Sequence, residues 1–390
     1  MSNDSFTETT STGWFSRIGA SIKGILFGIV MILVSAVLMF WNEGRAVKTH
    51  KTLDEGAKTV VTIPADALDG LKNGNLVYMT GPATAADPLG DSELGVTVAA
   101  LKLRRSAEMF QWKEETSTET RKKIGGGEET TTTYSYVKDW SGNQVDSSKF
   151  KKQAGHENPP MPLESKDWTA APVTVGAYTL SPGLTGQIDN FTPVQADAES
   201  EAPEMVAGRK VHPSGDGFYL GENPASPVVG DARVSHQASL PGDVSLIAKL
   251  RGSTFEAYTA KAGGSIEMLE TGTQSPESMF ETAQAGNKVL TWVLRFLGVL
   301  LMFFGFSAIF RPLSVLADVL PIAGTIVGAG TSLVALLLSI PVSLLIIATA
   351  WIFYRPLIGI PLLVLAVAGF VFLVKKIMSQ RKRQVGLAPS

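Results

Sequence analysis

Hydrophobic residues are concentrated in two parts of this chain, an apolar run over residues 24–41 and an almost continuous apolar block over residues 289–374. The segment between them, residues 42–287, has the mixed composition of a soluble domain. A bilayer core of ~30 Å requires about 20 apolar residues of helix. Irregular chain does not cross it, because unpaired backbone groups are too costly in hydrocarbon. The pattern therefore predicts a multi-pass membrane protein with one large domain held against one membrane face.

The first apolar run predicts an uncleaved transmembrane helix over residues 22–41, preceded by a cytoplasmic tail of residues 1–21. Residues 24–41 carry no charge, are too long for the core of a signal peptide and are not followed by a small-residue cleavage site. A cleaved signal peptide is the alternative. A second transmembrane helix is expected over residues 289–310, where Arg295 lies close enough to the start to extend its charge into water.

The apolar sequence after the second span is harder to divide. Residues 313–354 are too long for one helix and are interrupted by proline and glycine. We expect an interfacial or re-entrant segment over residues 313–330 and a third transmembrane helix over residues 331–354, with an additional, fifth span as the alternative. A fourth transmembrane helix follows over residues 357–374, and residues 375–390 form a basic cytoplasmic tail.

Basic residues predict the orientation of these helices. They precede the first span, follow the second and cluster after the fourth, whereas the turn after the third contains only Arg355. Because cytoplasmic segments beside membrane helices are enriched in lysine and arginine, we expect both termini in the cytoplasm and the large domain on the opposite side. Four aromatic residues at the predicted outer helix ends agree, since such rings prefer the headgroup layer: Trp41, Trp292, Trp351 and Tyr354.

Composition argues against several functions. The net charge is −2 and the pI is about 6.2, so nothing indicates a nucleic-acid partner. The chain has no cysteine, and its four histidines lack metal-ligand spacing. No nucleotide-binding or nucleophile-elbow motif is present. We therefore expect no cofactor, no metal site and no catalytic residue. Inside the apolar segments only Arg295 and Asp318 ionise, both near segment ends, which argues against a transporter.

Residues 42–287 have the pattern of a mainly β (α+β) domain built from antiparallel sheet. Residues 109–140 predict a long hairpin whose arms meet at the glycine-rich turn 122–127. Its aromatic residues lie at the base and its charges toward the tip, so we expect a packed base and a mobile tip. A helix capped by Ser275 is expected to lead into the second span. Further short strands are predicted at residues 59–63, 76–80, 96–98, 173–175, 244–248 and 254–258.

Four polar residues are candidates for a site where the domain meets the membrane. Asn42, Glu43 and Arg45 follow the first span directly, and Arg355 lies in the turn after the third. Beside the headgroups these side chains would either bind a polar lipid or anchor the helices to the domain. We favour anchoring.

Arg104 and Arg105 are candidates for contacts with a partner within the large domain. The alternation of apolar and basic residues over 101–105 predicts a strand with these two arginines on opposite faces. An ion pair between Arg105 and a carboxylate in the domain core is the simplest explanation of its position.

Five segments of the chain resemble the LUMA family, also called the transmembrane protein 43 family. They occur in order from the first span to the fourth and cover nearly the whole chain. They are NEGRAVKT at 42–49, ALKLRRxxEMxQW at 100–112, GHxNP at 155–159, ENP at 222–224 with VGDxRVS at 229–235, and WxFYRPL at 351–357.

The resemblance implies a four-span protein with a large domain between the first two spans and no established catalytic residues. Animal members reside in the endoplasmic reticulum and inner nuclear membrane, where they associate with lamins and emerin. This chain departs from the animal pattern in its N-terminal tail, its glycine-rich hairpin tip, its lack of cysteine and its basic tail, which resembles that of a bacterial inner-membrane protein. We therefore expect a bacterial homologue with an extracytoplasmic domain. Lamin or emerin partners are expected only for a eukaryotic source.

Together these features predict a non-enzymatic membrane scaffold. We expect it to form homo-oligomers in the lipid bilayer and to organise other membrane proteins through its large domain. The alternative is a lipid-binding sensor, or an enzyme, with a site where the domain meets the membrane.

Overall fold

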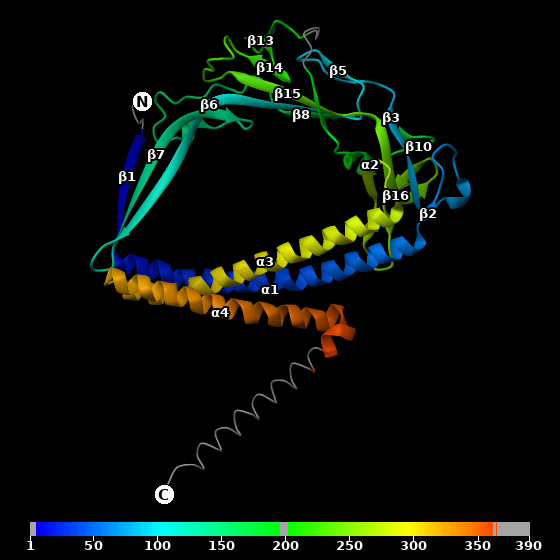
Figure 1. Ribbon diagram of the computed structural model, residues 1–390. Coiled ribbons are helices and arrows are strands. Elements are labelled where there is room, and N and C mark those ends of the chain that lie inside the picture. The colour runs from blue at the N-terminus through cyan, green and yellow to red at the C-terminus, as the bar shows by residue number, and fades with distance from the viewer. Residues whose placement is uncertain (1–4, 196–201, 362–363, 365–390) are drawn as a thin grey trace. The chain divides into compact units, whose positions relative to one another are not determined.

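The computed structural model describes residues 5–195, 202–361 and 364 (Figure 1). These residues form a β unit, residues 5–10, 52–120 and 130–283, and a helical unit, residues 11–51, 121–129 and the chain after 283. Of the expected fourth span, 357–374, only residues 357–361 and 364 are described, and they are helical. The expected basic tail, 375–390, lies outside the described residues.

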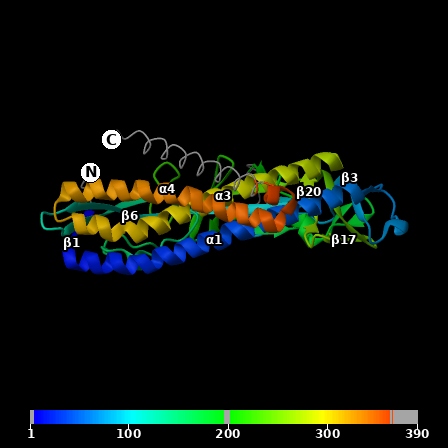
Figure 2. The same cartoon turned by 90° about the horizontal axis from the view of Figure 1, so that it is seen from below.

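Three long helices run beside one another in the helical unit: α1 (Trp14–Thr59), α3 (Pro276–Ala317) and α4 (Pro321–Tyr354) (Figures 1 and 2). Each is long and apolar enough to cross a membrane. The last turns of α1 and the first turns of α3 belong to the β unit. As expected, Ser275 caps α3, its hydroxyl accepting a hydrogen bond from the Ser278 amide.

Helices α1 and α3 pack closely because glycines face each other. A Cβ atom on Gly28 would lie 2.6 Å from the carbonyl oxygen of Gly305, and one on Gly298 would lie 2.4 Å from the side chain of Met39. The Ser35 hydroxyl donates a 2.7 Å hydrogen bond to the Gly298 carbonyl. Small residues therefore bring these backbones together, as they commonly do between membrane helices.

The described part of the chain does not show the break expected near residue 330. Helix α3 continues past Pro312 to Ala317, and α4 runs unbroken from Pro321 to Tyr354 with Pro341 inside it. Two glycines of α4 serve packing here: Gly324 faces Asp318, and Gly328 faces Ser314. In the sequence these glycines interrupt the apolar segment, and their spacing of four also allows close helix contact; in the structure they let α3 and α4 approach.

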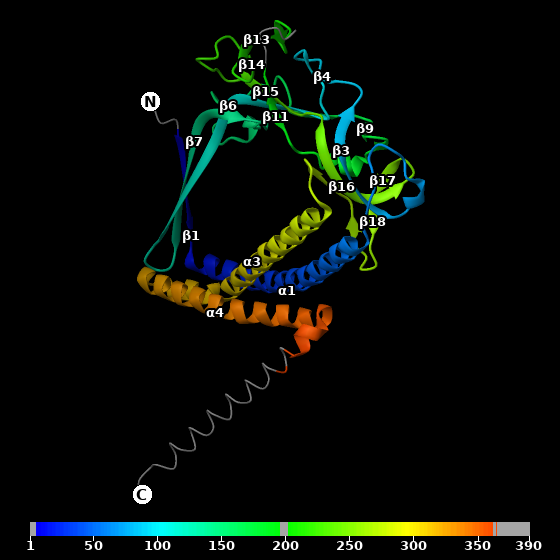
Figure 3. The same ribbon diagram turned by 45° about the vertical axis from the view of Figure 1, so that its right-hand side comes forward.

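Five strands of the β unit close into a ring. Strand β16 (Gly242–Arg251) pairs with both β17 (Thr254–Glu256) and β3 (Leu76–Ala85). The ring continues from β3 through β9 (Val173–Val175) and β10 (Tyr178–Thr179) back to β17 (Figure 3). Strands β2 (Val61–Thr62) and β20 (Met268–Thr271) extend this sheet.

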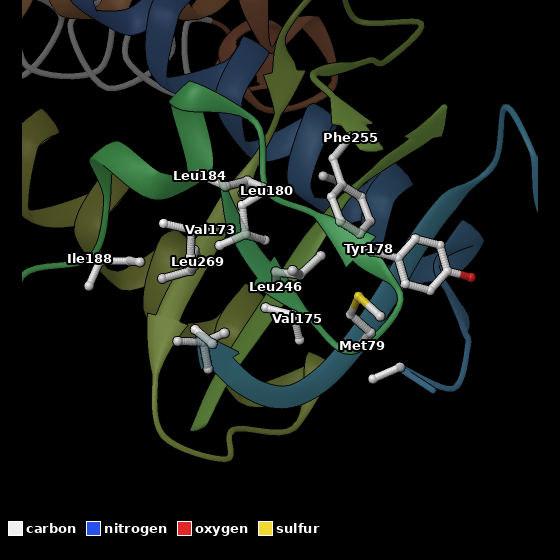
Figure 4. Packing of buried hydrophobic residues seen from close by; sticks show 14 of the residues in the cluster. Met79, Val173, Val175, Tyr178, Leu180, Leu184, Ile188, Leu246, Phe255 and Leu269 are labelled. Carbon is white, nitrogen blue, oxygen red and sulfur yellow. The ribbon is translucent and has the colours of Figure 1, made fainter. Parts of the chain in front are cut away.

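The largest hydrophobic core belongs to this ring. Met79, Val175, Tyr178 and Leu246 are each fully buried in it, and helix α2 (Pro182–Gly186) contributes the buried Leu184 (Figure 4). Strands β3 and β16 are buried on both faces: Val77 and Met79 point into this core, whereas Leu76, Tyr78 and Ile247 belong to a second hydrophobic cluster.

A second, nine-stranded sheet contains the long hairpin. Strands β6 (Lys102–Lys122) and β7 (Glu128–Ser141) form the hairpin expected over residues 109–140. The others are β1 (Ser5–Thr12), β8 (Lys166–Thr169), β11 (Thr192–Val194), β12 (Met205–Val206), β13 (Arg209–Ser214), β14 (Gly217–Leu220) and β15 (Ala232–Ser239). Two small ladders pair β4 (Leu89–Asp91) with β5 (Val96–Val98) and β18 (Tyr258–Thr259) with β19 (Ser265–Ile266).

The hairpin tip, expected to be mobile, is held in the helical unit by ion pairs. Asp318 is 1% exposed and accepts hydrogen bonds from Arg17 and, at 2.6 Å, from Lys122. Arg17 also pairs with Glu128 at 2.7 Å and donates to the carbonyl of Gly126. We call Arg17, Lys122, Glu128 and Asp318 the tip cluster.

The tip cluster bears on the predicted orientation. Arg17 precedes the apolar run of α1 and Lys122 follows it, so a membrane-crossing α1 would separate them by a bilayer core of ~30 Å. Strand β1 also precedes that run, yet it pairs with β7, and Lys151, which follows β7 in the chain, contacts Glu8 of β1 at 3.0 Å. The described contacts do not locate the membrane, so the opposite sides for residues 1–21 and the large domain stay a prediction.

Paired cysteines test which arrangement exists in a membrane. A Cβ atom on Gly127 would lie 3.4 Å from the Thr12 carbonyl oxygen, so a Thr12→Cys/Gly127→Cys variant should form an intramolecular disulfide in native membranes. The chain has no other cysteine to compete. The single variants serve as controls. A pair that stays reduced in membranes under oxidant would show that α1 separates the two residues there.

Candidate functional site

A buried carboxylate joins the three long helices. Glu43 of α1 is 0% exposed, and its two oxygens accept hydrogen bonds from Nε and Nη2 of Arg295 on α3 at 2.6 and 2.9 Å. The indole Nε1 of Trp351 on α4 donates to Glu43 Oε2 at 2.8 Å. A charge removed from water is tolerated only with a close, well-oriented partner, and a bidentate arginine is such a partner. One carboxylate therefore fixes α1, α3 and α4 at one level.

Aromatic rings enclose the Arg295 guanidinium. Its Cζ atom lies 4.8 Å from the ring centre of Trp292 and 5.9 Å from that of Trp351. Aromatic faces attract cations, most strongly where water is excluded. The expected extension of Arg295 into water is therefore not observed: its side chain is 15% exposed and is used to neutralise Glu43.

Asn42 and Arg45 join α1 to α3 beside this ion pair. The Asn42 amide donates to the Thr291 carbonyl at 3.1 Å, and its oxygen accepts from Arg45. Arg45 also donates to Asn287 Oδ1 at 3.0 Å and to the Thr291 hydroxyl at 2.9 Å. These polar groups are therefore used in helix–helix contacts.

The structure brings together four of the six residues singled out in the sequence. Asn42, Glu43 and Arg45 lie in the cluster just described, and Arg355 caps the C-terminus of α4, its amide donating to the Trp351 carbonyl at 2.8 Å. The partners Asn287 and Thr291, and the roles of Arg295 and Trp351, were not predicted from the sequence. The sequence contains a signal for the ion pair: Glu43 directly follows the first apolar run, and Arg295 lies just inside the second.

Arg104 and Arg105 lie in the β unit and belong to no common site with the others. Arg105 is 2% exposed, and its Nη1 lies 2.8 Å from Oδ1 of the buried Asp91 and 2.8 Å from Oε2 of Glu93. The predicted pairing of Arg105 with an internal carboxylate is thus confirmed. Arg104, on the opposite strand face, pairs with Asp167 at 2.9 Å and is half exposed.

The Asp91 carboxylate has a second buried partner, since Nε2 of His236 lies 2.9 Å from its Oδ2. Burial raises the pKa of Asp91, but the hydrogen bonds from His236 and Arg105 outweigh it and hold that pKa below its ordinary value. Asp91 therefore stays ionised at neutral pH and neutralises a buried arginine. Among the described residues, no group of three or more His, Asp or Glu side chains is arranged to hold a metal ion.

Removing the Glu43 charge should destabilise the helices. In a Glu43→Gln variant Arg295 stays buried without a counter-charge, and we expect a loss of about 3 to 5 kcal/mol. Unfolding in detergent micelles, followed by helical circular dichroism, measures this. A Glu43→Gln/Arg295→Met variant should lose less than Glu43→Gln alone, because no unpaired charge remains. Equal stability of Glu43→Gln and the parent would contradict the assigned role.

Acid should weaken the β unit through Asp91. Because the folded-state pKa of this carboxyl is depressed, its contribution is present above its unfolded pKa of about 3.9 and is lost as the pH falls through the lower folded value. An Asp91→Asn variant should therefore be less stable by about 3 kcal/mol at pH 7, with the gap narrowing below about pH 4. Denaturant titrations at pH 3 to 7 would show this convergence, and a gap independent of pH would exclude it.

Known proteins resemble this chain along most of its length. Residues 109–356, which include Arg295 and Trp351, match the family described as Transmembrane protein 43. Transmembrane protein 43 of Rattus norvegicus is 36% identical over 365 residues, which are 90% of this chain and 89% of the rat protein.

Two further relatives extend the comparison. Transmembrane protein 43 of Homo sapiens is 35% identical over 364 residues, covering 90% of this chain and 89% of the human protein. The Transmembrane protein 43 homolog of Drosophila melanogaster is 29% identical over 367 residues, covering 92% and 96%. No solved structure matches the fold. Identity at this level over nine-tenths of both chains establishes the relationship suggested by the five sequence segments, and the chain is an integral membrane protein that belongs to the transmembrane protein 43 family.

Proposed function

We propose that this protein is a non-catalytic membrane scaffold that self-associates through its apolar helices and presents its β unit to other membrane proteins. The observation that carries the proposal is the use made of the buried charges. Glu43 and Arg295 neutralise each other between helices, and Asp91 and Arg105 do so between strands. These groups stabilise a framework, and their side chains are directed at one another.

The outer faces of α1 and α4 offer a surface for a second copy. They enclose an apolar groove of about 630 Å³, lined on α1 by Val37, Phe40 and Trp41 and on α4 by residues that include Leu345 and Tyr354. Val37 is 68% exposed and Leu345 is 67% exposed. Within a bilayer such a groove is filled by lipid chains or by another helix, and close packing favours a complementary helix.

The alternative of a lipid sensor built on Asn42, Glu43 and Arg45 is less well supported. Asn42 and Glu43 are each 0% exposed, and the Arg45 guanidinium is directed at Asn42, Asn287 and Thr291. A headgroup would have to displace these contacts. The geometry therefore favours anchoring for this trio.

The proposal extends to the compartment. We propose a bacterial inner membrane, supported by the basic tail, or the endoplasmic reticulum and inner nuclear membrane for a eukaryotic source. Lamin- or emerin-type partners apply only to the second case.

Cross-linking between copies tests self-association. A Val37→Cys variant should form disulfide-linked dimers in membranes, because this side chain points outward from α1. Met39→Cys is the matched control: Met39 is 0% exposed and packs on Gly298, so its thiol should not reach a second copy. Native mass spectrometry in mild detergent gives the stoichiometry. A strict monomer at micromolar concentration, with no Val37→Cys cross-link, would contradict the scaffold proposal.

A further inference from the structure

A polar groove lies beside the Glu43 cluster, between the ends of the apolar helix segments. It has a volume of about 270 Å³ and takes residues from α1, α3 and the end of α4. Its lining includes Asn287 and Thr291, which accept hydrogen bonds from Arg45, and the aromatic residues Trp292 and Trp351. The groove thus shares residues with the polar contacts between α1 and α3.

The groove carries positive charge that nothing in its lining balances. Lys288 and Arg355 both line it, and no aspartate or glutamate does. Arg295 also lines it, but Glu43 neutralises that charge. Among the described residues neither the Lys288 ammonium nor the Arg355 guanidinium forms an ion pair within 4.0 Å. Two cations that face one concave, partly enclosed site favour an anion there.

Two features of the surroundings identify the class of anion. Trp292 and Trp351 follow the pattern of interfacial aromatic residues, which sit at the level of lipid headgroups. Arg355 directly follows Tyr354, and Tyr354 lines the apolar groove between α1 and α4. A phospholipid would place its anionic head in the basic groove and its acyl chains along the apolar faces of the helices. Free phosphate would use only the basic groove.

We propose that this groove binds the phosphate of an anionic phospholipid, with Arg355 and Lys288 as its cationic ligands. The guanidinium of Arg355 can present two parallel N–H donors to phosphate oxygens, and the Lys288 ammonium adds a point charge. His50 lies on the same groove, where its Nδ1 is 3.0 Å from Gln284 Oε1. The site thus uses residues next to, and distinct from, the trio that anchors α1.

Native mass spectrometry of the full chain, titrated with phosphatidylglycerol or phosphatidylcholine, tests the proposal. We expect retention of phosphatidylglycerol over phosphatidylcholine. Affinity should fall about fivefold for Lys288→Gln or Arg355→Gln alone and about 20-fold for the double variant. The matched control is Lys149→Gln/Lys58→Gln, which removes the same charge at exposed positions on the 3-10 helix Ser147–Lys149 and the end of α1.

Three further arms separate the outcomes. Arg355→Lys should recover part of the affinity because it keeps the charge. Circular dichroism should show that the double variant stays folded, since neither side chain has a described ion-pair partner. Equal binding of both lipids, or an unchanged double variant, would overturn the proposal. Displacement of the lipid by millimolar inorganic phosphate would assign the site to free phosphate. None of these results depends on oligomeric state. A negative result here would therefore not contradict the scaffold proposal, which the cross-linking experiment tests separately.

Discussion

The constraint on which the helical unit depends is the cost of burying the Glu43 carboxylate. A charge in a medium of low dielectric is stable only with a counter-charge at close range and hydrogen bonds to its remaining lone pairs. Arg295 supplies the first and Trp351 the second, from two different helices. Apolar helices otherwise slide along one another at little cost. This carboxylate specifies one register for all three, and the polar groove with its unpaired cations follows from that register.

The β unit also contains a buried carboxylate, Asp91, which is neutralised by residues from neighbouring strands. Arg105 points into the sheet interior from β6, and Asp91 reaches it from β4, with His236 of β15 on the other side of the carboxylate. Three strands thus share one buried charge pair, and His236 lies 145 residues from Asp91 in the chain. In both units the polar interior fixes which elements are neighbours, while the apolar contacts supply most of the free energy.

Local signals in the sequence predicted much of this structure. Period-two runs identified the strands, the glycine-rich turn located the hairpin, and the face alternation around Arg105 predicted its internal partner. The start of α4 was predicted too late in the chain, because Gly324 and Gly328 were counted as interruptions of the helix. Their packing against neighbouring residues depends on contacts that a local pattern does not contain. The partnership of Glu43 with Arg295 joins residues 252 positions apart. No local pattern encodes such a pair, so Arg295 was interpreted as a side chain that reaches water.

The closed ring of strands has a consequence for the order of folding. Its closing pair joins β3 to β16, with Met79 opposite Leu246, so nearly the whole domain must be synthesised before the ring can close. Contacts of such sequence separation form slowly, because the chain entropy lost in bringing the ends together precedes any gain from packing. During translation one edge of β3 therefore stays unpaired until β16 leaves the ribosome. By then α1 is already synthesised, and only a few short strands remain before α3. The newly made chain therefore passes through a stage in which its first apolar helix is present and the ring of strands is still open. Chaperones that cover unpaired strand edges would bind during that stage.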